Sequence, residues 1–470
     1  MCSERGFLPP SPPKMKVLVV GAGGREHALA WKISLSPLCD EVLCAPGNPG
    51  TAEVARNVPV AATDLPALVQ LAKSEEVDLV VIGPEDPLCD GLADQLREAG
   101  ILVFGPGAAG ANLERSKIEA KDLLERYRIP TAGAKRFDHS GRAKGYLESL
   151  TEWPMVVKAD GLAAGKGVYV CDTLEEAHSA VDAIMEERRH GDAGERILIE
   201  EFLKGEEASS FAITDGETLL ILETVQDHKQ VEEGDRGPNT GGMGVYSPVS
   251  SVSNRLHRQI EQRVLVPTVH ALSREEIKYR GVLFVGLMLT DAGPSVVEYN
   301  VRFGDPECQA LVRRMKSDLL PILLATAEGN LDKIEPPEWD SRVVVGVVAA
   351  AAGYPSSYAK GAPISGLKEA AALEGVEIFQ AGTRLEGSEI VTNGGRVLCV
   401  TALGDDLEQA RERAYAAYDL IAWEGKFCRG DIGIRHQGKS GEEYALDEDP
   451  DEVQSETHGE VQESPARPSV

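Results

Sequence analysis

A glycine-rich loop flanked by lysines is the first stretch of this sequence that could do chemistry. In KADGLAAGKGVYVC, Lys158 precedes the loop, and Lys166 lies within it between Gly165 and Gly167. Ammonium groups beside bare backbone N–H groups are suited to binding phosphate oxygens. We therefore expect this loop to cover the phosphates of a nucleotide.

The loop does not have the Walker A spacing. Only three residues separate Gly161 from Gly165, and Gly167 replaces the Ser or Thr that would contact magnesium. The residues after the loop, VYVC, are β-branched and aromatic, which favours a strand rather than a helix. We predict a hairpin with strands over 154–158 and 168–171, and metal ligands located elsewhere in the chain.

The run VVEYNVRFGDPE supplies candidate metal ligands. Glu298, Asn300 and Arg302 are two residues apart, so on a strand they share one face, while Val297 and its alternate neighbours point into the core. A carboxylate beside an amide oxygen suits a hard cation such as Mg²⁺, and the arginine can grip a carboxylate or a phosphate. An amphipathic strand with a solvated polar face is the alternative.

Two further segments could contact a nucleotide or a second substrate. RILIEEFLKGEEAS joins two predicted strands, and its residues 200–203 could hold a base through backbone groups, with Glu207 free for ribose hydroxyls. A solvated charged turn would look the same. The long polar loop QDHKQVEEGDRGPNTGGMGVYSP is of a length usually reserved for function. In it, Asp227 could pair with an ammonium group or only cap the loop.

The first loop, VLVVGAGGREHALAW, resembles a dinucleotide fingerprint but lacks its third glycine, because Glu26 stands there. The second strand also ends without the acidic residue that would hold a ribose, so NAD binding is not expected. The helix N-terminus, with free N–H groups and Arg25, could still bind one phosphate. A simple strand-to-helix turn is the alternative.

Alternating strands and helices must position these residues. The apolar runs KVLVV, EVLCA, VDLVVI and ILVFG predict a parallel sheet covered by helices, whose four carboxyl-end loops should line one site. A second unit contains the hairpin. A third, beginning near Arg342, has the pattern of a small α+β domain. The predicted limits are a disordered leader at 1–14, domains at 15–120, 121–327 (with a lid at about 137–207) and 328–435, and a disordered acidic tail at 436–470.

Composition and net charge limit the classes of partner that this protein can bind. The net charge of −28 argues against nucleic acid and anionic membranes, and no apolar run is long enough to span a membrane. The eight cysteines have no C-x-x-C spacing, which indicates reduced intracellular thiols. We expect small-molecule substrates, a cytoplasmic location with an organelle left open, and a monomer or weak homodimer.

From about Met15 to Arg435 the sequence resembles the phosphoribosylamine–glycine ligase family of ATP-grasp enzymes in purine synthesis. GGREHALAW, KADGLAAGKGV, GPNTGGMG, the RFGDPE run and VTNGGRVL carry the resemblance in family order. It implies an ATP-grasp fold, with a doubly wound N-terminal domain and a small C-terminal α+β domain. It also implies the cofactors ATP and Mg²⁺ or Mn²⁺, and a glycyl phosphate intermediate.

The resemblance assigns roles position by position. The residues implied for nucleotide, metal and substrates are Lys117, Lys158, Gly165, Lys166 and Gly167 for the ATP phosphates; Glu200, Glu201, Phe202, Leu203 and Glu207 for adenine and ribose; Glu298 and Asn300 for the metal; Gly24, Arg25, Glu26, Asn48, Pro84 and Glu85 for phosphoribosylamine; and Asp227 and Arg302 for glycine. Lys158, Asp227 and Arg302 are the candidate catalytic residues. The sequence departs from the family pattern at Asp86 and Gln230, whose roles stay open.

Three other functions remain in view. A different ATP-grasp ligase would share the loop and VVEYN but use another acid or amine. A nicotinamide-dependent oxidoreductase would rest on VLVVGAGG alone. A nucleotide sensor would bind ATP and form no product.

Overall fold

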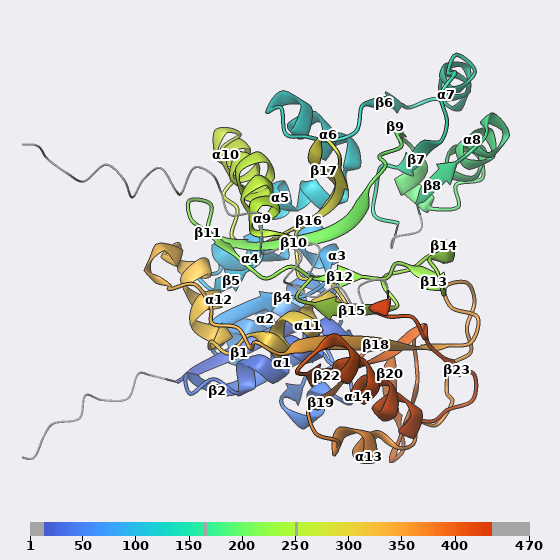
Figure 1. Ribbon diagram of the computed structural model, residues 1–470. Helices are drawn as coiled ribbons and strands as arrows, with labels where there is room; N and C mark the ends of the chain where they lie inside the picture. Colours follow the sequence, from blue (N-terminus) through green and yellow to red (C-terminus); the bar gives the residue numbers. More distant parts are fainter. Residues whose placement is uncertain (1–13, 164–166, 250–251, 435–470) are drawn as a thin grey trace, which may run out of the picture.

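The N-terminal part of the chain forms the predicted parallel sheet, with strand order β3-β2-β1-β4-β5 (Figure 1). The structure is a computed structural model that describes residues 14–163, 167–249 and 252–434. The strands are β1 Met15–Gly21, β2 Cys39–Pro46, β3 Arg56–Asn57, β4 Leu79–Ile82 and β5 Leu102–Phe104; the helices are α1 Gly24–Ser34, α2 Leu65–Ser74, α3 Glu85–Cys89, α4 Leu92–Glu98 and α5 Ala108–Arg115. All four predicted strands are confirmed.

Three of the four predicted loops meet at the carboxyl edge of this sheet. The loop after β1 contacts the loop after β2 through Asn48, and Gly83 after β4 lies against the side chain of Glu26. The fourth loop differs: Gly105 donates its N–H to the carbonyl of Arg280 (3.1 Å) and so packs on the central part of the chain. The expectation that all four loops line one site is therefore wrong for the fourth.

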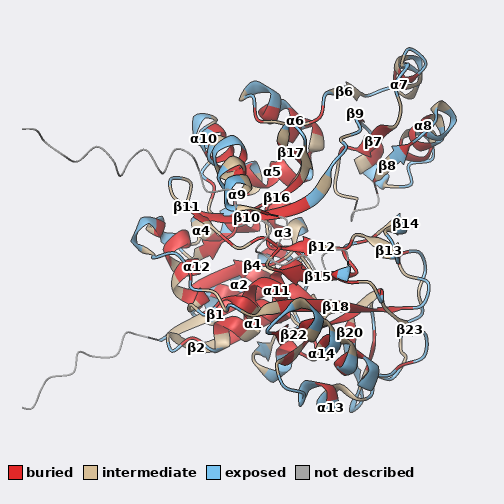
Figure 2. Ribbon diagram, viewed as in Figure 1, coloured by how far each residue is buried: buried red, intermediate tan, exposed pale blue. Residues whose placement is uncertain are grey.

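A second, antiparallel sheet with order β11-β10-β16-β17 forms the centre of the molecule. Its strands are β10 Glu206–Thr214, β11 Leu219–Ile221, β16 Gly281–Thr290 and β17 Gly293–Asn300; the helices of this part are α6 Lys117–Arg126, α9 Asn254–Ile260, α10 Val266–Arg274, α11 Glu307–Arg314 and α12 Leu319–Glu328. Strands β10 and β16 are buried along most of their length, as their red colour in Figure 2 shows. Helix α1 packs against α11, which ties the N-terminal loops to the segment after β17.

The segment predicted to be a lid, which keeps that name below, contains a separate four-stranded sheet with order β6-β9-β7-β8, at the upper right of Figure 1. It comprises β6 Ala134–Phe137, β7 Met155–Ala159, β8 Val168–Cys171 and β9 Ile197–Glu201, with helices α7 Ser140–Leu147 and α8 Leu174–Val181. Strands β7 and β8 are antiparallel neighbours, which confirms the predicted hairpin. The lid has a small apolar core of its own, including Leu147, Val157 and Val181.

The C-terminal sheet has the order β12-β15-β18-β22-β19, with β23 also paired to β18. Its elements are β18 Val343–Ala351, β19 Val376–Gln380, β22 Arg396–Gly404, β23 Lys426–Phe427, the hairpin β20 Thr383–Glu386 with β21 Glu389–Thr392, and helices α13 Leu367–Ala371 and α14 Leu407–Leu420. The remaining strands come from the predicted long loop and are β12 Gln226–Asp227, β13 Gln230–Glu232, β14 Arg236–Asn239 and β15 Gly244–Ser247.

The sequence suggested an irregular loop here, but the structure shows regular strands. The segment forms four short strands, which its polar and glycine residues did not indicate. Strands β12 and β15 complete the sheet of the third unit, and β13 pairs with β14. None of the helices within the described ranges is long and apolar enough to cross a bilayer.

Candidate active site

Lys158 lies on β7 in a buried ion-pair cluster. Its Nζ is 2.6 Å from Oε2 of Glu200 on the neighbouring strand β9, and it donates to the carbonyl of Val297 (3.2 Å). The other oxygen of Glu200 is 2.8 Å from Nζ of Lys121 on α6. All three side chains are at most 5% exposed. Burial opposes the charge of Glu200, but the two lysines hold the pKa of its carboxyl below the usual value.

Glu200 thus neutralises lysines, whereas its neighbours face outward. Glu201 and Phe202 are exposed, and Leu203 is half-buried. The Glu201 carboxylate accepts the N–H of Gly133 at 3.2 Å. Glu201 is the last residue of β9, and Phe202 and Leu203 begin the connection to β10, where a base could reach backbone groups.

Lys117 is the first residue of α6, and its Nζ donates to the carbonyl of Gly161 in the lid (3.1 Å). Burial lowers the pKa of its ammonium group, opposed by the charge of Glu298. Among the predicted loop residues, Gly165 and Lys166 lie outside the described residues. Gly167 accepts the N–H of Ala159 (2.8 Å), and a side chain there would collide with the hairpin.

The candidate metal ligands Glu298 and Asn300 lie on β17, both half-buried. Burial opposes the charge of Glu298, but Lys229 and Lys158 lower the pKa of its carboxyl. One carboxylate and one amide oxygen fit Mg²⁺, which binds through few protein ligands and keeps its other positions for water and phosphate. No group of three or more His, Cys, Asp or Glu side chains suited to a metal lies among the described residues.

Strand β17 departs from the predicted alternation at Val297. The pairing with β16 shifts between Gly286 and Leu287, which is a β-bulge, so Val296 is buried and Val297 is only half-buried. The prediction that Val297 points into the core is wrong because the bulge inserts one residue. As a result its carbonyl is free to accept Lys158.

Asp227 on β12 lies close to Gly242 and is surrounded by Lys229 and further acidic groups. Burial raises the pKa of Asp227 to about 6, with Lys229 opposing and the acidic neighbours Glu207 and Glu298 adding to the rise. Lys229 lies between those two carboxylates, at 3.8 Å from Glu207 and 3.6 Å from Glu298. Glu207 is half-exposed, as a ribose ligand would need to be.

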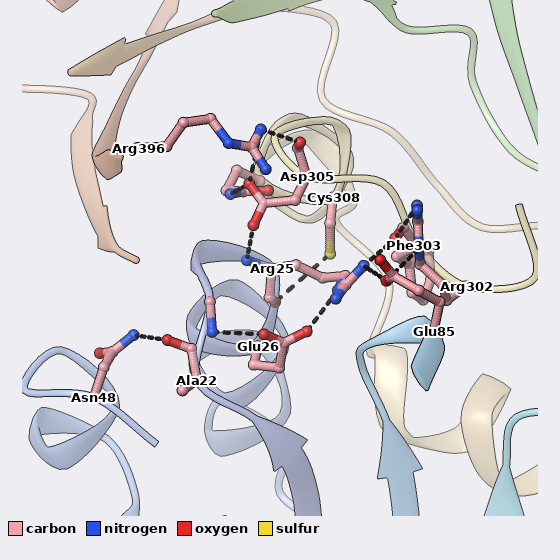
Figure 3. Close-up of polar contacts among 12 residues, drawn as sticks. Ala22, Arg25, Glu26, Asn48, Glu85, Arg302, Phe303, Asp305, Cys308 and Arg396 are labelled. Carbon is pink, nitrogen blue, oxygen red and sulfur yellow. Dashed lines mark hydrogen bonds and ion pairs between the residues drawn. The ribbon is translucent and has the colours of Figure 1, made fainter. Parts of the chain in front are cut away.

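The N-terminal candidates form a second cluster, shown in Figure 3. Arg25 Nε is 2.5 Å from Oε1 of Glu26, and its Nη1 donates to the carbonyl of Phe303 (3.0 Å). The sequence suggested that N–H groups at the start of α1 could bind a phosphate, but two of them are already paired with carboxylates. Glu26 accepts the N–H of Gly23 (2.6 Å), and Asp305 accepts that of Arg25 (3.3 Å). Gly24 lies between these two capped amides.

Asn48 has a joining role. Its Nδ2 donates to the carbonyls of Ala22 (2.9 Å) and Gln380 (2.8 Å), and its Oδ1 accepts the N–H groups of Gly50 and Thr51. These four contacts use the full hydrogen-bonding capacity of the amide. Asn48 therefore fixes the loop around the site and has no polar atom left for a ligand.

Arg302 connects this cluster to β17. Its Nε is 3.2 Å from Oε2 of Glu85, and its Nη2 is 2.7 Å from Oε1 of Glu114 on α5. Glu85 follows Pro84 at the start of α3; burial opposes its charge, but Arg302 and Arg25 hold the pKa of its carboxyl down at about 2. The cluster therefore holds more carboxylates than arginines and has no surplus of cations.

Sequence reasoning missed several residues at this junction. Glu114 also accepts the N–H of Val301 (2.8 Å). Arg396, from VTNGGRVL, donates to the carbonyl of Gly241 (2.6 Å) and is 3.8 Å from Asp305. Asp305 and Arg396 stand inside motifs already singled out, so a charged residue next to glycines in those motifs was the available signal. Glu114 lies in an ordinary helix and gave none.

The two open positions are also placed. Gln230 uses its backbone carbonyl to accept Nη1 of Arg429 (3.0 Å). Asp86 lines a cavity of about 450 Å³ together with Arg115 and Arg196, on the lid side of α3. Burial raises the pKa of the Asp86 carboxyl, and the charge of the adjacent Glu85 adds to the rise.

Comparison with known proteins identifies the family. Family profiles described as Phosphoribosylglycinamide synthetase N domain, ATP-grasp (A) domain and C domain match residues 15–114, 115–308 and 344–435. Phosphoribosylamine–glycine ligases from Agrobacterium fabrum and Escherichia coli K12 are each 51% identical, over 89% and 90% of this chain and 98% of their own length. This chain belongs to the phosphoribosylamine–glycine ligase family.

Solved structures agree with the assignment. A crystal structure of phosphoribosylamine–glycine ligase from Thermotoga maritima has a TM-score of 0.78 and 35% identity, covering 89% of this chain and all of that one. N5-carboxyaminoimidazole ribonucleotide synthetase from the same organism shares the fold, with a TM-score of 0.60 at 17% identity over 87% and 99% of the chains. The ATP-grasp fold is confirmed, and with it the expectation of an ATP-dependent ligase.

Proposed function

We propose that this protein joins glycine to 5-phosphoribosylamine, using ATP, to give glycinamide ribonucleotide, ADP and phosphate. The observation that carries the proposal is the course of β17. One strand bears the metal-ligand pair Glu298 and Asn300 beside the lysine cluster, and two residues later Arg302 pairs with Glu85 of the N-terminal part. A phosphate-activating site and an acceptor site would thus share one wall.

In this proposal the ATP phosphates are held by two lysines outside the loop, Lys117 and Lys158. Within the loop they are held by Lys166 and the glycines Gly165 and Gly167. Residues 200–203 surround adenine, with Glu200 acting through the lysines, and Glu207 binds ribose. Glu298 and Asn300 would hold Mg²⁺ or Mn²⁺, which when bound neutralises charge on the phosphates.

The acceptor would lie among residues 24–26, Pro84 and Glu85. Carboxylates there suit the hydroxyls and amine of phosphoribosylamine as hydrogen-bond donors. Asp227 would receive the ammonium group of glycine, and Arg302 its carboxylate. Asn48 supports the loop from behind.

Catalysis needs no side-chain nucleophile. One oxygen of the glycine carboxylate attacks the terminal phosphorus of ATP, ADP leaves, and glycyl phosphate forms. The amine of phosphoribosylamine then attacks the carbonyl carbon and expels inorganic phosphate. The lysines and Arg302 would hold the reacting groups together and stabilise the charge that develops.

Labelled glycine tests this route. With ¹⁸O in both carboxylate oxygens, one label should appear in inorganic phosphate for each glycinamide ribonucleotide formed, and the amide should keep the other. Unlabelled phosphate beside accumulating product would refute the acyl phosphate. ADP release that depends on another acid or amine would favour a different ligase, and ATP binding without product would favour a sensor.

We further propose domain limits at 120 and 327, a cytoplasmic location, and a monomer or weak homodimer that binds neither nucleic acid nor membranes. The cysteines that the structure describes are all free, which supports a reducing compartment.

A further inference from the structure

Asp160 joins the lid to the first turn of α6. It follows β7 directly, two residues after Lys158, and is 5% exposed. Its Oδ1 accepts the hydroxyl of Ser116 (2.9 Å) and the N–H of Ile118 (2.8 Å). Ser116 is the N-cap of α6, so a carboxylate from the lid completes the cap of a helix that belongs to the centre of the molecule.

Hydrogen bonds to backbone carbonyls also join the lid to the start of α6. The N–H of Lys117 donates to the carbonyl of Asp160 (3.1 Å), while Lys117 Nζ donates to the carbonyl of Gly161 (3.1 Å). Lys117 is therefore held to two adjacent lid residues, to Asp160 through its backbone and to Gly161 through its side chain. The other carboxylate oxygen of Asp160 lies 2.6 Å from Nη2 of Arg196, whose side chain is half-exposed.

The physical preference for this arrangement is clear. A helix N-terminus presents unpaired N–H groups and partial positive charge, and a buried carboxylate satisfies both. Hydrogen bonds to a buried ionised group are stronger than neutral ones. The contact thus fixes where α6 begins relative to β7, and these are the elements that carry Lys117 and Lys158.

We propose that Asp160 is a positioning residue that sets the placement of Lys117 against Lys158 for nucleotide phosphates. This deepens the proposed function, because it rests on the role of those lysines in ATP binding. Asp160 itself touches no substrate in this proposal. It acts through the start of α6.

The test compares four variants of the full chain. Asp160→Ala removes both acceptors of the carboxylate. Asp160→Asn keeps an oxygen for Ser116 and Ile118. Arg196→Gln removes only the outer ion pair, and Asp172→Ala is a matched control at an exposed carboxylate of the same lid. The measurements are the dissociation constant for ADP with Mg²⁺ by calorimetry, the KM values for ATP and glycine, and the melting temperature.

Asp160→Ala should raise the ADP dissociation constant and the ATP KM at least tenfold, with the glycine KM changed less than twofold. The other three variants should stay within twofold of wild type. If Asp160→Ala does not fold, Ser116→Ala should raise the ADP dissociation constant about threefold with glycine KM unchanged. Wild-type ADP binding in whichever of these two variants is measured, or equal rises in the KM values for ATP and glycine, would overturn the proposal.

The ADP arm separates this proposal from the proposed function. If wild-type protein binds ADP but makes no glycinamide ribonucleotide, the ligase proposal fails. The comparison of ADP affinities then still decides whether Asp160 positions the lysines.

Discussion

Glu200→Gln tests the buried lysine cluster most directly. The substitution keeps the shape of the side chain but leaves Lys121 and Lys158 without their shared carboxylate. At 2.6 and 2.8 Å, each contact is worth roughly 6 kcal/mol at an effective dielectric constant of about 20, before desolvation. Breaking a buried pair costs about 3–5 kcal/mol net.

Remaining hydrogen bonds reduce that cost. Lys121 still donates to Thr131 (2.6 Å) and Ala132 (3.1 Å), and Lys158 to Val297 (3.2 Å). We therefore expect the lower end, about 3 kcal/mol in the free energy of unfolding, and a melting temperature lower by about 5–10 °C. Nucleotide affinity should fall too, because Lys158 loses its fixed position.

The deficit should depend on pH. In the variant Lys121 is buried without its counter-charge, so the pKa of its ammonium group falls further below the value of about 10.4 in the unfolded chain. The unfolded state then binds protons more tightly, and the variant gains stability as pH rises. The gap between variant and wild type should narrow between pH 7 and pH 10.

Differential scanning calorimetry from pH 7 to pH 10 measures this gap. Glu201→Gln is the matched control: its carboxylate is exposed and accepts the Gly133 N–H, which the amide oxygen of Gln can also accept, so a change within about 0.5 kcal/mol is expected. Adding Lys121→Met to Glu200→Gln should recover part of the loss by removing one unpaired cation. Glu200→Gln as stable as Glu201→Gln at pH 7 would refute the reasoning.

Three further outcomes are expected. Lys158→Met should lower ATP turnover about 10²–10³-fold while circular dichroism stays that of wild type, and wild-type turnover would contradict its phosphate role. Glu298→Gln should raise the Mg²⁺ concentration for half-maximal rate about tenfold, because one ligand charge is lost; an unaltered titration would remove it from the metal site. Glu85→Gln should be less stable than wild type at pH 7. Because the folded pKa of Glu85 is lowered to about 2, that difference should vanish as pH falls from about 5 to about 2, and a difference that persists at pH 2 in urea titrations would contradict the Arg302 pairing.

Local patterns in the sequence were sufficient to predict the strands and to single out individual candidate side chains. The β-branched residues after Gly167 predicted the hairpin, and four apolar runs predicted the parallel sheet. Each of these signals depends on neighbours a few residues apart. The bulge at Val297 broke the period of two, because it depends on the partner strand β16 and leaves no mark in β17 itself.

Charge partners were not predictable in the same way. Arg302 meets Glu114 across 188 positions, and Asp305 meets the N–H of Arg25 across 280. A lone charged residue in a sequence looks the same whether water or a distant carboxylate neutralises it. For this reason the sequence allows either a phosphate site or a simple turn at the N-terminal loop, whereas in the fold Glu26 and Asp305 accept its N–H groups.

The C-terminal sheet has a consequence for biosynthesis. Strand β15 at 244–247 pairs with β18 at 343–351, so it waits for roughly a hundred further residues before its partner exists. At about 5–20 residues per second the ribosome needs roughly 5–20 seconds to supply them. During that interval the backbone N–H and C=O groups on the β18 side of β15 are unpaired and open to wrong partners. Nascent chains stalled before residue 343 should therefore depend more on chaperones than chains stalled after residue 404.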